Sequence, residues 1–242
     1  MKFVSINIEG DKHFERILPF LVAEKPDVLA LQEIFEADLD IIKQTTGLNN
    51  CIFYPQANIT KPNIHLPLRG NWGVAIFARD IVEAEHFYYF GHQNGVIATF
   101  ENEQPDLIDR VVIVAKARVA GEDFQVATVH FTWSGKAETT DAQRRDYAVL
   151  QNFLDKFEEM ILCGDLNAAR GAEIWSALAK KYTDNIPAEI ETTIDRNLHK
   201  SGKDIRLVVD TLFTSSHYGV SNERVVANTS DHMAVVAEIE RV

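Results

Sequence analysis

The sequence has few cysteines, no long apolar run and no excess of positive charge. Only two cysteines occur in its 242 residues, Cys51 and Cys163, which is too few for a disulfide framework, and we expect both to be reduced thiols. No apolar run approaches the roughly 18 residues that are needed to span a bilayer. Residues 1–9 contain only a short apolar stretch and no small-residue cleavage site, which indicates a strand and not a signal peptide. We therefore expect a cytoplasmic protein with no membrane partner.

The balance of charge argues against one class of partner. The chain carries 24 Lys and Arg residues against 36 Asp and Glu residues, a formal net charge of −12. Composition therefore provides no general attraction to a phosphate backbone, which weakens the case for a tight nucleic-acid binder. A phosphate-bearing substrate is still compatible with this charge, because bound cations can reverse the local field at a site.

The composition otherwise resembles that of ordinary globular proteins with a sizeable core, with 46% hydrophobic and 25% charged residues. We find no linker and no repeat, so residues 1–242 are predicted to form a single domain, which we expect to be a monomer. Some predicted strands, such as 111–115 and 207–209, are apolar almost throughout, which is typical of strands buried on both faces. Two packed sheets covered outside by three or four helices would bury them in this way, so an α/β sandwich is predicted.

Hydrophobic periodicity and turn residues predict the individual elements. A helix capped by Asp11 carries Phe14, Ile17 and Leu21 at helical spacing, although Pro19 would kink or shorten it. Further helices are predicted over residues 37–46, from Thr139 or Thr140 to about residue 157, and over 172–182. Strands are predicted over residues 2–8, 28–31, 51–54, 72–79, 82–90, 96–101, 110–119, 124–131, 160–166, 207–213, 220–226 and 233–239. Residues 55–70, which contain three prolines, and residues 183–206 are predicted to be irregular.

The segment Gly164-Asp165-Leu166-Asn167 ends one of the apolar runs. Asp165 and Asn167 are spaced i, i+2, which in an extended chain points both side chains the same way. Gly164 lets the backbone approach its surroundings closely. A carboxylate and an amide that emerge together from a buried strand can hold a water molecule or a phosphate oxygen. The alternative is an ordinary strand followed by an Asx turn.

Other apolar runs also end at, or are preceded by, polar residues: Asn7, Gln32, Glu33, His130, Asp210, Asp231 and His232. Each has an ordinary explanation when it is taken alone, such as a turn cap, a surface acid or a core histidine. Together they supply carboxylates, amides and two histidines without a thiolate cluster, which suits Mg²⁺ or Mn²⁺ better than zinc. The set also suits phosphoryl chemistry, in which a cation neutralises the phosphate, an acid orients a water and an imidazole binds the developing charge.

The order of these motifs resembles the endonuclease/exonuclease/phosphatase family of metal-dependent phosphohydrolases. The resemblance is carried, from one end of the chain to the other, by Asn7, Leu31-Gln32-Glu33, Gly73-Val74-Ala75-Ile76, His130, Gly164-Asp165-Leu166-Asn167, Asp210 and Ser230-Asp231-His232. It implies a four-layer α/β sandwich, in which two mostly antiparallel sheets are covered by helices. It also implies a hydrolase of phosphoester bonds, above all phosphodiesters, that uses Mg²⁺ or Mn²⁺.

The resemblance further implies a role for each residue at the metal and the attacking water. Glu33 is similar to the principal metal ligand of the family, with Asn7 nearby, and Asp231 resembles a further acidic ligand. Asp165 resembles the acid that aligns the attacking water, and Asn167 is expected to help position the phosphate.

The remaining implied roles concern binding of the phosphate. His232 would contact the phosphate and is expected to be held in its tautomer by Asp210. His130 resembles a second phosphate-contacting group. Asn7 is expected to contact the substrate as well as the metal. Arg144 is the candidate for a basic substrate-binding position after His130, with the adjacent Arg145 as the alternative.

The sequence constrains the substrate less than the reaction. Val209-Asp210-Thr211 stands where inositol phosphatases usually carry Cys-Asp-Arg, and His130 stands where abasic endonucleases tend to have tyrosine. No secretion signal or membrane-facing apolar hairpin supports a sphingomyelinase, and the aromatic run 87–90 fits a core strand. A phosphoester is the expected substrate, and nucleic acid stays open as a partner. The alternatives are a noncatalytic phosphate- or nucleic-acid-binding domain that kept the fold and, among the enzymes, a DNA endonuclease.

Overall fold

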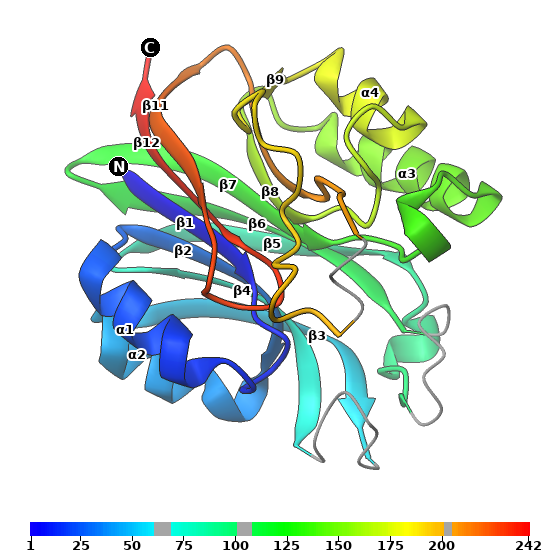
Figure 1. Cartoon of the computed structure of the whole chain (residues 1–242), viewed down its shortest axis with the longest axis horizontal. Helices are drawn as coiled ribbons and strands as arrows, with labels where there is room; N and C mark the ends of the chain where they lie inside the picture. The colour runs from blue at the N-terminus through cyan, green and yellow to red at the C-terminus, as the bar shows by residue number, and fades with distance from the viewer. Residues whose placement is uncertain (61–68, 101–107, 201–204) are drawn as a thin grey trace.

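The strands of the protein form two six-stranded sheets in a computed structural model that describes residues 1–60, 69–100, 108–200 and 205–242 (Figure 1). The first sheet has the strand order β11-β12-β1-β2-β4-β3, and the second has the order β5-β6-β7-β8-β10-β9. The strands are β1 Lys2–Asn7, β2 Val28–Phe35, β3 Asn50–Ile59, β4 Gly70–Ala78, β5 Ile81–Phe90, β6 Arg110–Val119, β7 Glu122–His130, β8 Ile161–Asp165, β9 Thr183–Asp184, β10 Asp210–Thr214, β11 Tyr218–Val226 and β12 Ala234–Arg241.

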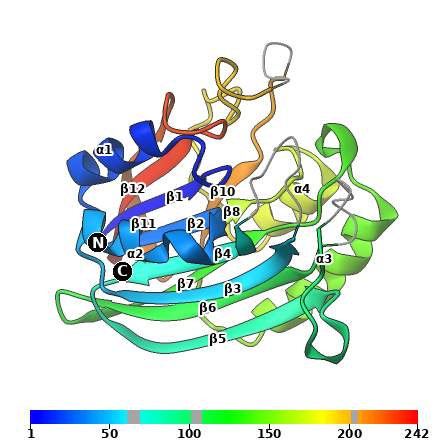
Figure 2. The same ribbon diagram turned by 90° about the horizontal axis from the view of Figure 1, so that it is seen from below.

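Helices cover the outer faces of the two sheets, as the view from below shows (Figure 2). The α-helices of the described residues are α1 Phe14–Glu24, α2 Leu39–Thr46, α3 Asp141–Leu154 and α4 Glu173–Ala179. Ile17 of α1 and Ile42 of α2 belong to a buried cluster with residues of the first sheet. Leu150 of α3 and Trp175 of α4 belong to the main core, which also fills the space between the sheets. The predicted α/β sandwich is therefore confirmed, and central strands such as β6 and β8 are apolar because they are buried on both faces.

The register of the strands brings the polar ends of the apolar runs together. β1 lies between β12, to which it is antiparallel, and β2, to which it is parallel. In the second sheet β8 is parallel to β7 and antiparallel to β10. Asp165 at the end of β8 is thereby opposite both His130 at the end of β7 and Asp210 at the start of β10. Residues that are far apart in the sequence thus meet at one end of the sandwich.

Two predicted strands do not form as expected. The strand prediction for residues 96–101 was wrong: residues 96–100 make a single isolated bridge, between Thr99 and Asn58, and residue 101 lies outside the described residues. Residues 207–209 were also wrongly included in a strand. The carbonyl oxygens of Val208 and Val209 accept from the backbone of Arg170 and Leu166, so this segment pairs with the loop after β8 and the regular ladder begins only at Asp210.

Two further predictions, the start of the irregular segment at Pro55 and the cap of the first helix, were also wrong. Residues 55–59, predicted as irregular, continue β3, because a register shift between Pro55 and Ala57 accommodates the proline in this edge strand. The rest of that predicted loop, residues 61–68, lies outside the described residues. Asp11 does not cap α1, whose N-cap is His13, and Pro19 is incorporated inside the helix. Asp11 instead forms an ion pair with Arg69.

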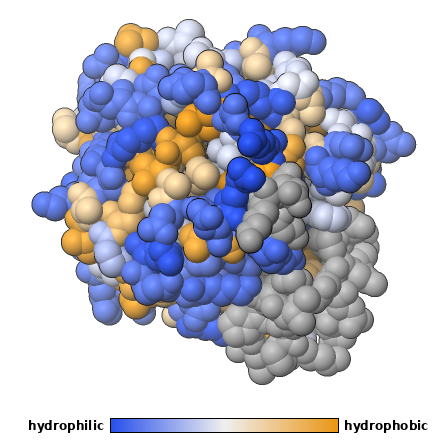
Figure 3. Space-filling model, viewed as in Figure 1, coloured by the Kyte–Doolittle hydropathy of each residue, from blue (hydrophilic) through white to orange (hydrophobic). Residues whose placement is uncertain are grey.

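The surface is mixed in polarity. On the face shown in Figure 3, hydrophilic residues form most of the periphery and hydrophobic residues gather nearer the centre. Among the residues that the structure describes, no helix is long enough and apolar enough to cross a membrane. Both cysteines are free, and Cys163 is buried in β8.

Candidate active site

Asp165 lies at the centre of the site because a glycine precedes it. Gly164 has φ +119°, and a Cβ atom at this position would lie 2.1 Å from the carbonyl oxygen of Val129 on β7. Glycine alone accommodates both this conformation and this approach. Asp165 follows at the end of β8 with 2% of its surface exposed, and its Oδ2 accepts from Nδ2 of Asn7 at 3.1 Å. This hydrogen bond joins the ends of the two sheets.

Asn167 leaves the extended conformation and forms an Asx turn. Its φ is +48°, and its backbone nitrogen donates to Oδ1 of Asp165 at 2.7 Å. Its side-chain Nδ2 donates to the carbonyl oxygen of Phe131 at 3.1 Å. The turn that was the ordinary alternative for this motif is therefore present, and it orients the carboxylate of Asp165 while fixing the segment that follows β7.

A β-bulge in β2 sets the direction of the Glu33 side chain. The register between β2 and β4 shifts between Gln32 and Ile34, and Glu33 has φ +62°, which is uncommon for a residue with a side chain. Oε1 of Glu33 accepts from Nδ2 of Asn7 at 3.0 Å. The amide nitrogen of Asn7 thus holds the carboxylates of Glu33 and Asp165 together. The amide oxygen of Asn7, Oδ1, accepts from the backbone nitrogen of Glu9 at 3.3 Å.

Two histidines flank this pair of carboxylates. Nδ1 of His232 lies 2.9 Å from Oδ2 and 3.0 Å from Oδ1 of Asp210, while its Nε2 lies 3.8 Å from Oδ2 of Asp165. Nε2 of His130 lies 3.7 Å from the same Asp165 oxygen and 3.6 Å from Oε1 of Glu33. The structure therefore brings together five predicted residues in one cluster, Asn7, Glu33, His130, Asp165 and His232, with Asp210 behind His232. All of them are buried except Glu33, which is partly exposed.

The two histidines have opposite electrostatic environments. Burial alone would lower the pKa of His232, but the charges of Asp210 and Asp165 raise it well above its ordinary value. Burial, together with the positive charge of Arg110, lowers the pKa of His130 well below its ordinary value. Burial raises the pKa of Asp165 to about 6, against the opposing effect of His232. The electrostatics of the site therefore favour the charged form of His232 and the neutral form of His130.

The acidic side of the site has the donor set of a hard cation. Burial, and then the negative charge of Asp231, raises the pKa of Glu33 to about 8. Burial also raises the pKa of Asp231, whose Oδ1 accepts from Ser230 at 3.1 Å. Carboxylates that are held close enough to disfavour one another's ionisation are stabilised by a divalent cation, and the donors are all oxygen atoms. Glu33 and Asp231 thus fit the metal that the sequence predicts.

Two residues outside the predicted set border Asp231. Glu9, His13 and Asp231 each place one potential ligand atom within 4.8 Å of the others. Nε2 of His13 lies 3.1 Å from Glu9, which also pairs with Lys12. Although burial opposes the shift, these hydrogen bonds lower the pKa of Glu9 to about 2. Glu9 stands two positions after Asn7, so the i, i+2 rule applied to Asp165 and Asn167 would have found it.

The sequence profile of the Endonuclease/Exonuclease/phosphatase family matches residues 4–232 of this chain. The chain belongs to this family. A search of curated proteins found no match.

Several solved structures are similar in fold. An endonuclease/exonuclease/phosphatase from Beutenbergia cavernae has a TM-score of 0.75 and 18% identity, covering 100% of this chain and 71% of the other. The mannosyl-6-phosphatase Bt3783 of Bacteroides thetaiotaomicron has a TM-score of 0.70 and 15% identity, covering 99% of each chain. The human Nocturnin catalytic domain with bound sulfate has a TM-score of 0.65 and 18% identity, covering 100% of this chain and 94% of that domain. At these identities the likeness establishes the four-layer sandwich of the family.

Buried polar residues outside the motifs hold the backbone around this cluster in place. Gln56 of β3 and Arg110 of β6 both donate to the carbonyl oxygen of His130, at 3.0 and 3.2 Å. The hydroxyl of Thr193 accepts from the backbone nitrogens of Val209 and Asp210, both at 3.1 Å. The sequence offered little sign of these roles, because Thr193 lies in a segment predicted as irregular and Gln56 follows a proline.

Arg144 does not join this cluster. Its guanidinium contacts Glu173 and Asp141 on the exposed side of α3, at distances of 2.7 to 3.0 Å. The alternative, Arg145, donates to Asp146 at 2.8 Å and lies over the ring of Phe90. Both arginines are thus tied to neighbouring residues on the helix side of the second sheet, and neither contacts Asp165 or the histidines.

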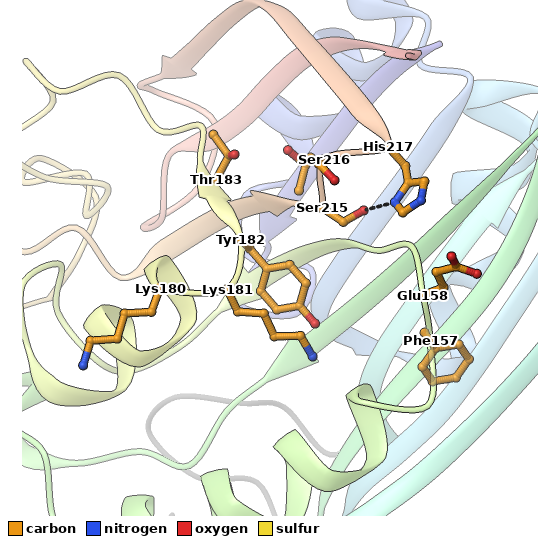
Figure 4. A pocket seen from close by; sticks show the side chains of 10 residues that line it. Phe157, Glu158, Lys180, Lys181, Tyr182, Thr183, Ser215, Ser216 and His217 are labelled. Carbon is orange, nitrogen blue, oxygen red and sulfur yellow. Dashed lines mark hydrogen bonds between the residues drawn. The ribbon is translucent and has the colours of Figure 1, made fainter.

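A separate hollow lies at the other end of β8. It has a volume of about 390 Å³ and lies between the chain after α3, the end of α4 and the turn after β10 (Figure 4). Lys181 and Tyr182 line one side and Ser215 and His217 the other. Lys181 is paired with Asp155, and none of the predicted site residues lines this hollow. The hollow is therefore separate from the cluster around Asp165.

Proposed function

We propose that this chain is a divalent-metal-dependent hydrolase of phosphoester bonds, with phosphodiesters as its main substrates. The observation that carries the proposal is the continuous contact from Asp210 through His232 to Asp165. His232 lies 2.9 Å from Asp210 and 3.8 Å from Asp165, and Asn7 links Asp165 to Glu33. An imidazole whose charged form is favoured, a buried acid and a potential metal ligand thus surround one point, and this arrangement supports hydrolysis of a phosphoester.

The residues divide the chemistry between them. Asp165, held at one oxygen by the backbone of Asn167, presents its other oxygen between the two histidines and can accept a hydrogen bond from a water aligned for attack. His232, kept positive by Asp210, can stabilise the charge that develops on the phosphoryl oxygens. His130, kept neutral by burial and Arg110, can donate a hydrogen bond to the same group.

The cation would be held by Glu33 and Asp231, with Asn7 beside them. When bound, Mg²⁺ or Mn²⁺ supplies positive charge that polarises the phosphoryl group and stabilises the transition state. The raised pKa of Glu33, about 8, supports this assignment, because without a cation its ionised form is opposed by burial and by Asp231. The second group of ligand atoms, on Glu9, His13 and Asp231, lies on the same side of the site.

The charge of the chain favours small or flexible substrates over long duplexes. With a net charge of −12, little long-range attraction to duplex DNA is available, so affinity must come from the site itself. Among proteins of similar fold, the Bacteroides thetaiotaomicron protein is named a mannosyl-6-phosphatase, which acts on a small phosphate ester, and Nocturnin binds a sulfate anion. These comparisons support an anion-binding hydrolytic site without specifying its substrate.

A panel of phosphoesters tests the proposal. A synthetic phosphodiester, a phosphomonoester, a short single strand, RNA, abasic DNA and plasmid DNA are each offered with Mg²⁺ or Mn²⁺ at physiological salt. We expect cleavage of the small phosphodiester or the short strand to be at least as efficient as plasmid nicking. His232→Gln should abolish it, whereas the matched His217→Gln in the turn after β10 should leave it unchanged.

Two outcomes would contradict the proposal and support another function. Binding of phosphate without hydrolysis of any substrate by either metal form would assign a noncatalytic binding domain. Tight binding to intact duplex, with a salt dependence that implies many phosphate contacts, would assign a DNA endonuclease.

A further inference from the structure

Trp133 differs from the other tryptophans of the chain. It is 46% exposed, whereas Trp72 and Trp175 are only 5% and 2% exposed. The other large hydrophobic side chains that are similarly exposed in the described residues are all valine or isoleucine, so Trp133 is the aromatic member of this group. The exposed part of its indole ring is a flat apolar surface that a ligand can cover.

The backbone before Trp133 is fixed to the catalytic segment. The carbonyl oxygen of Phe131 accepts from the side chain of Asn167, and that of Thr132 accepts from Nε2 of Gln143 at 2.8 Å. The same Gln143 nitrogen donates to the carbonyl oxygen of Asn167 at 2.9 Å. Trp133 stands three residues after His130, so their Cα atoms are separated by about 11 Å at most. Trp133 therefore belongs to the loop that leaves the site after His130.

The backbone after Trp133 is strained and packed. Lys136 and Ala137 both adopt left-handed conformations, with φ +59° and +53°. Ala137 is buried in a cluster with Ile194 and Val209, the neighbours of Thr193 and Asp210. The carbonyl oxygen of Ala137 also accepts from the backbone nitrogen of Ala169 at 3.2 Å. Strain of this kind persists where the surroundings fix a conformation, and it is concentrated at functional sites.

We propose that Trp133 stacks on a flat aromatic ring of the substrate, carried by the group esterified to the reacting phosphate. The inference rests on the proposed function and deepens it, since it assigns the side of the site that binds this group. Stacking on a tryptophan needs no long-range attraction, which suits a chain with a net charge of −12. The shared chemistry is the π face, whether the ring is a nucleobase or a simple aryl group.

The fluorescence of Trp133 provides a binding test that does not depend on turnover. Because Trp72 and Trp175 are buried, quenching of tryptophan emission by acrylamide should report mainly on Trp133. Adenosine 5′-monophosphate, phenyl phosphate and ribose 5-phosphate are titrated with Mg²⁺ present. We expect the two aromatic phosphates to protect the emission from quenching, and ribose 5-phosphate to leave it accessible.

Variants of Trp133 complete the test. Trp133→Ala should weaken binding of the aromatic phosphates by roughly tenfold or more, the scale of a lost stacking contact, and leave the affinity for ribose 5-phosphate unchanged. Trp133→Phe should restore most of the aromatic preference. Equal protection by all three ligands, or equal affinities in wild type and Trp133→Ala, would overturn the inference.

The same measurements distinguish a nucleobase from an aryl group, and they test the stacking site separately from the proposed hydrolysis. Preference for adenosine 5′-monophosphate over phenyl phosphate would support stacking on a nucleobase, and the reverse order would support stacking on an aryl group. Protection by an aromatic phosphate in a protein that hydrolyses no phosphoester would retain the stacking site and reject the proposed reaction. Hydrolysis with no preference for aromatic ligands would reject the stacking site alone.

Discussion

The hydroxyl of Thr193 lies 3.1 Å from the backbone nitrogen of Asp210 and accepts its hydrogen. The same oxygen accepts from Val209, and Thr193 is fully buried. Its own backbone nitrogen donates to Leu207, and its carbonyl oxygen accepts from Met233 at 2.7 Å. Thr193 therefore connects the segment that carries Asp210 with the segment that carries His232, and it sets the distance between the two partners of the acid-histidine pair.

Replacing Thr193 by valine should lower kcat more than it raises KM. Valine keeps the shape but removes the acceptor, so two buried N–H groups lose their partner at a cost of about 1–3 kcal/mol each. Thr193→Ser keeps the hydroxyl and should retain most of the activity. Steady-state kinetics and the free energy of unfolding of both variants check this. Equal losses in the serine and valine variants would show that the hydroxyl does not position Asp210.

Asp210→Asn should lower the rate of hydrolysis by a factor on the order of 10⁴, as loss of the orienting acid does in serine proteases. The substitution keeps the volume but removes the charge that raises the pKa of His232. Asp123→Asn is the matched control, because Asp123 is paired with Arg118 on the surface, away from the site. Near-native turnover of the Asp210 variant would mean that His232 is not held by this carboxylate.

Glu33 should make the metal-free protein less stable as the pH rises. Its pKa in the folded chain, about 8, lies above the ordinary 4.5, so folding favours the protonated form. The contribution of Glu33 is complete below pH 4.5 and is lost as the pH rises through 8. Glu33→Gln should therefore reduce the loss of stability between pH 5 and pH 8. Urea unfolding in chelator at both pH values measures the effect.

Glu9 supplies the opposite case for the same experiment. Its pKa of about 2 lies below the ordinary 4.5, so its contribution is present above pH 4.5 and is lost as the pH falls towards 2. Glu9→Gln should therefore flatten the acid side of the stability curve below pH 4.5. Because the hydrogen bond to Glu9 raises the pKa of His13, the variant should also lose the stability that His13 contributes while it is protonated. If the two variants respond alike, the shifts do not arise from these local environments.

Chelation should abolish hydrolysis, and Mg²⁺ or Mn²⁺ should restore it. Binding of the cation to the folded chain should also raise the Tm, because a ligand of the native state stabilises it by mass action. Glu33→Gln should reduce this rise, whereas Glu83→Gln, on the exposed edge strand β5, should not. Differential scanning fluorimetry with and without the metal measures the change. Full recovery of the rate with zinc alone would contradict the predicted hard-cation site.

The sequence predicted the sandwich and the cluster because both follow from strand patterns. Apolar runs of β-branched residues mark buried strands, and the polar residues that end them have to lie at the edges of the sheets. Asn7, Glu33, Asp165 and His232 could be found in this way. The bulge at Glu33 could not, since a left-handed glutamate has no local sequence signal, and it depends on how β2 pairs with β4.

Side-chain partners were harder to predict than strands. Arg144 and Arg145 are adjacent on one helix, and their directions depend on which acids α3 and α4 present to them. The roles of Gln56 and Arg110 also arise from tertiary contact, because both reach the carbonyl oxygen of His130 from other strands. Exposure of Trp133 likewise depends on the strained loop that follows it, which no periodicity describes.

The position of β1 between β12 and β2 has a consequence for the timing of activity. Asn7 and Asp165, which share a hydrogen bond, are 158 positions apart, and His232 is placed only when β12 pairs with β1. Such distant pairings form late and slowly, because the long intervening chain has to be ordered first. A nascent or partly unfolded chain can therefore carry most of its secondary structure and still be unable to cut a phosphoester. Under the proposed function, hydrolysis would begin only at this final assembly.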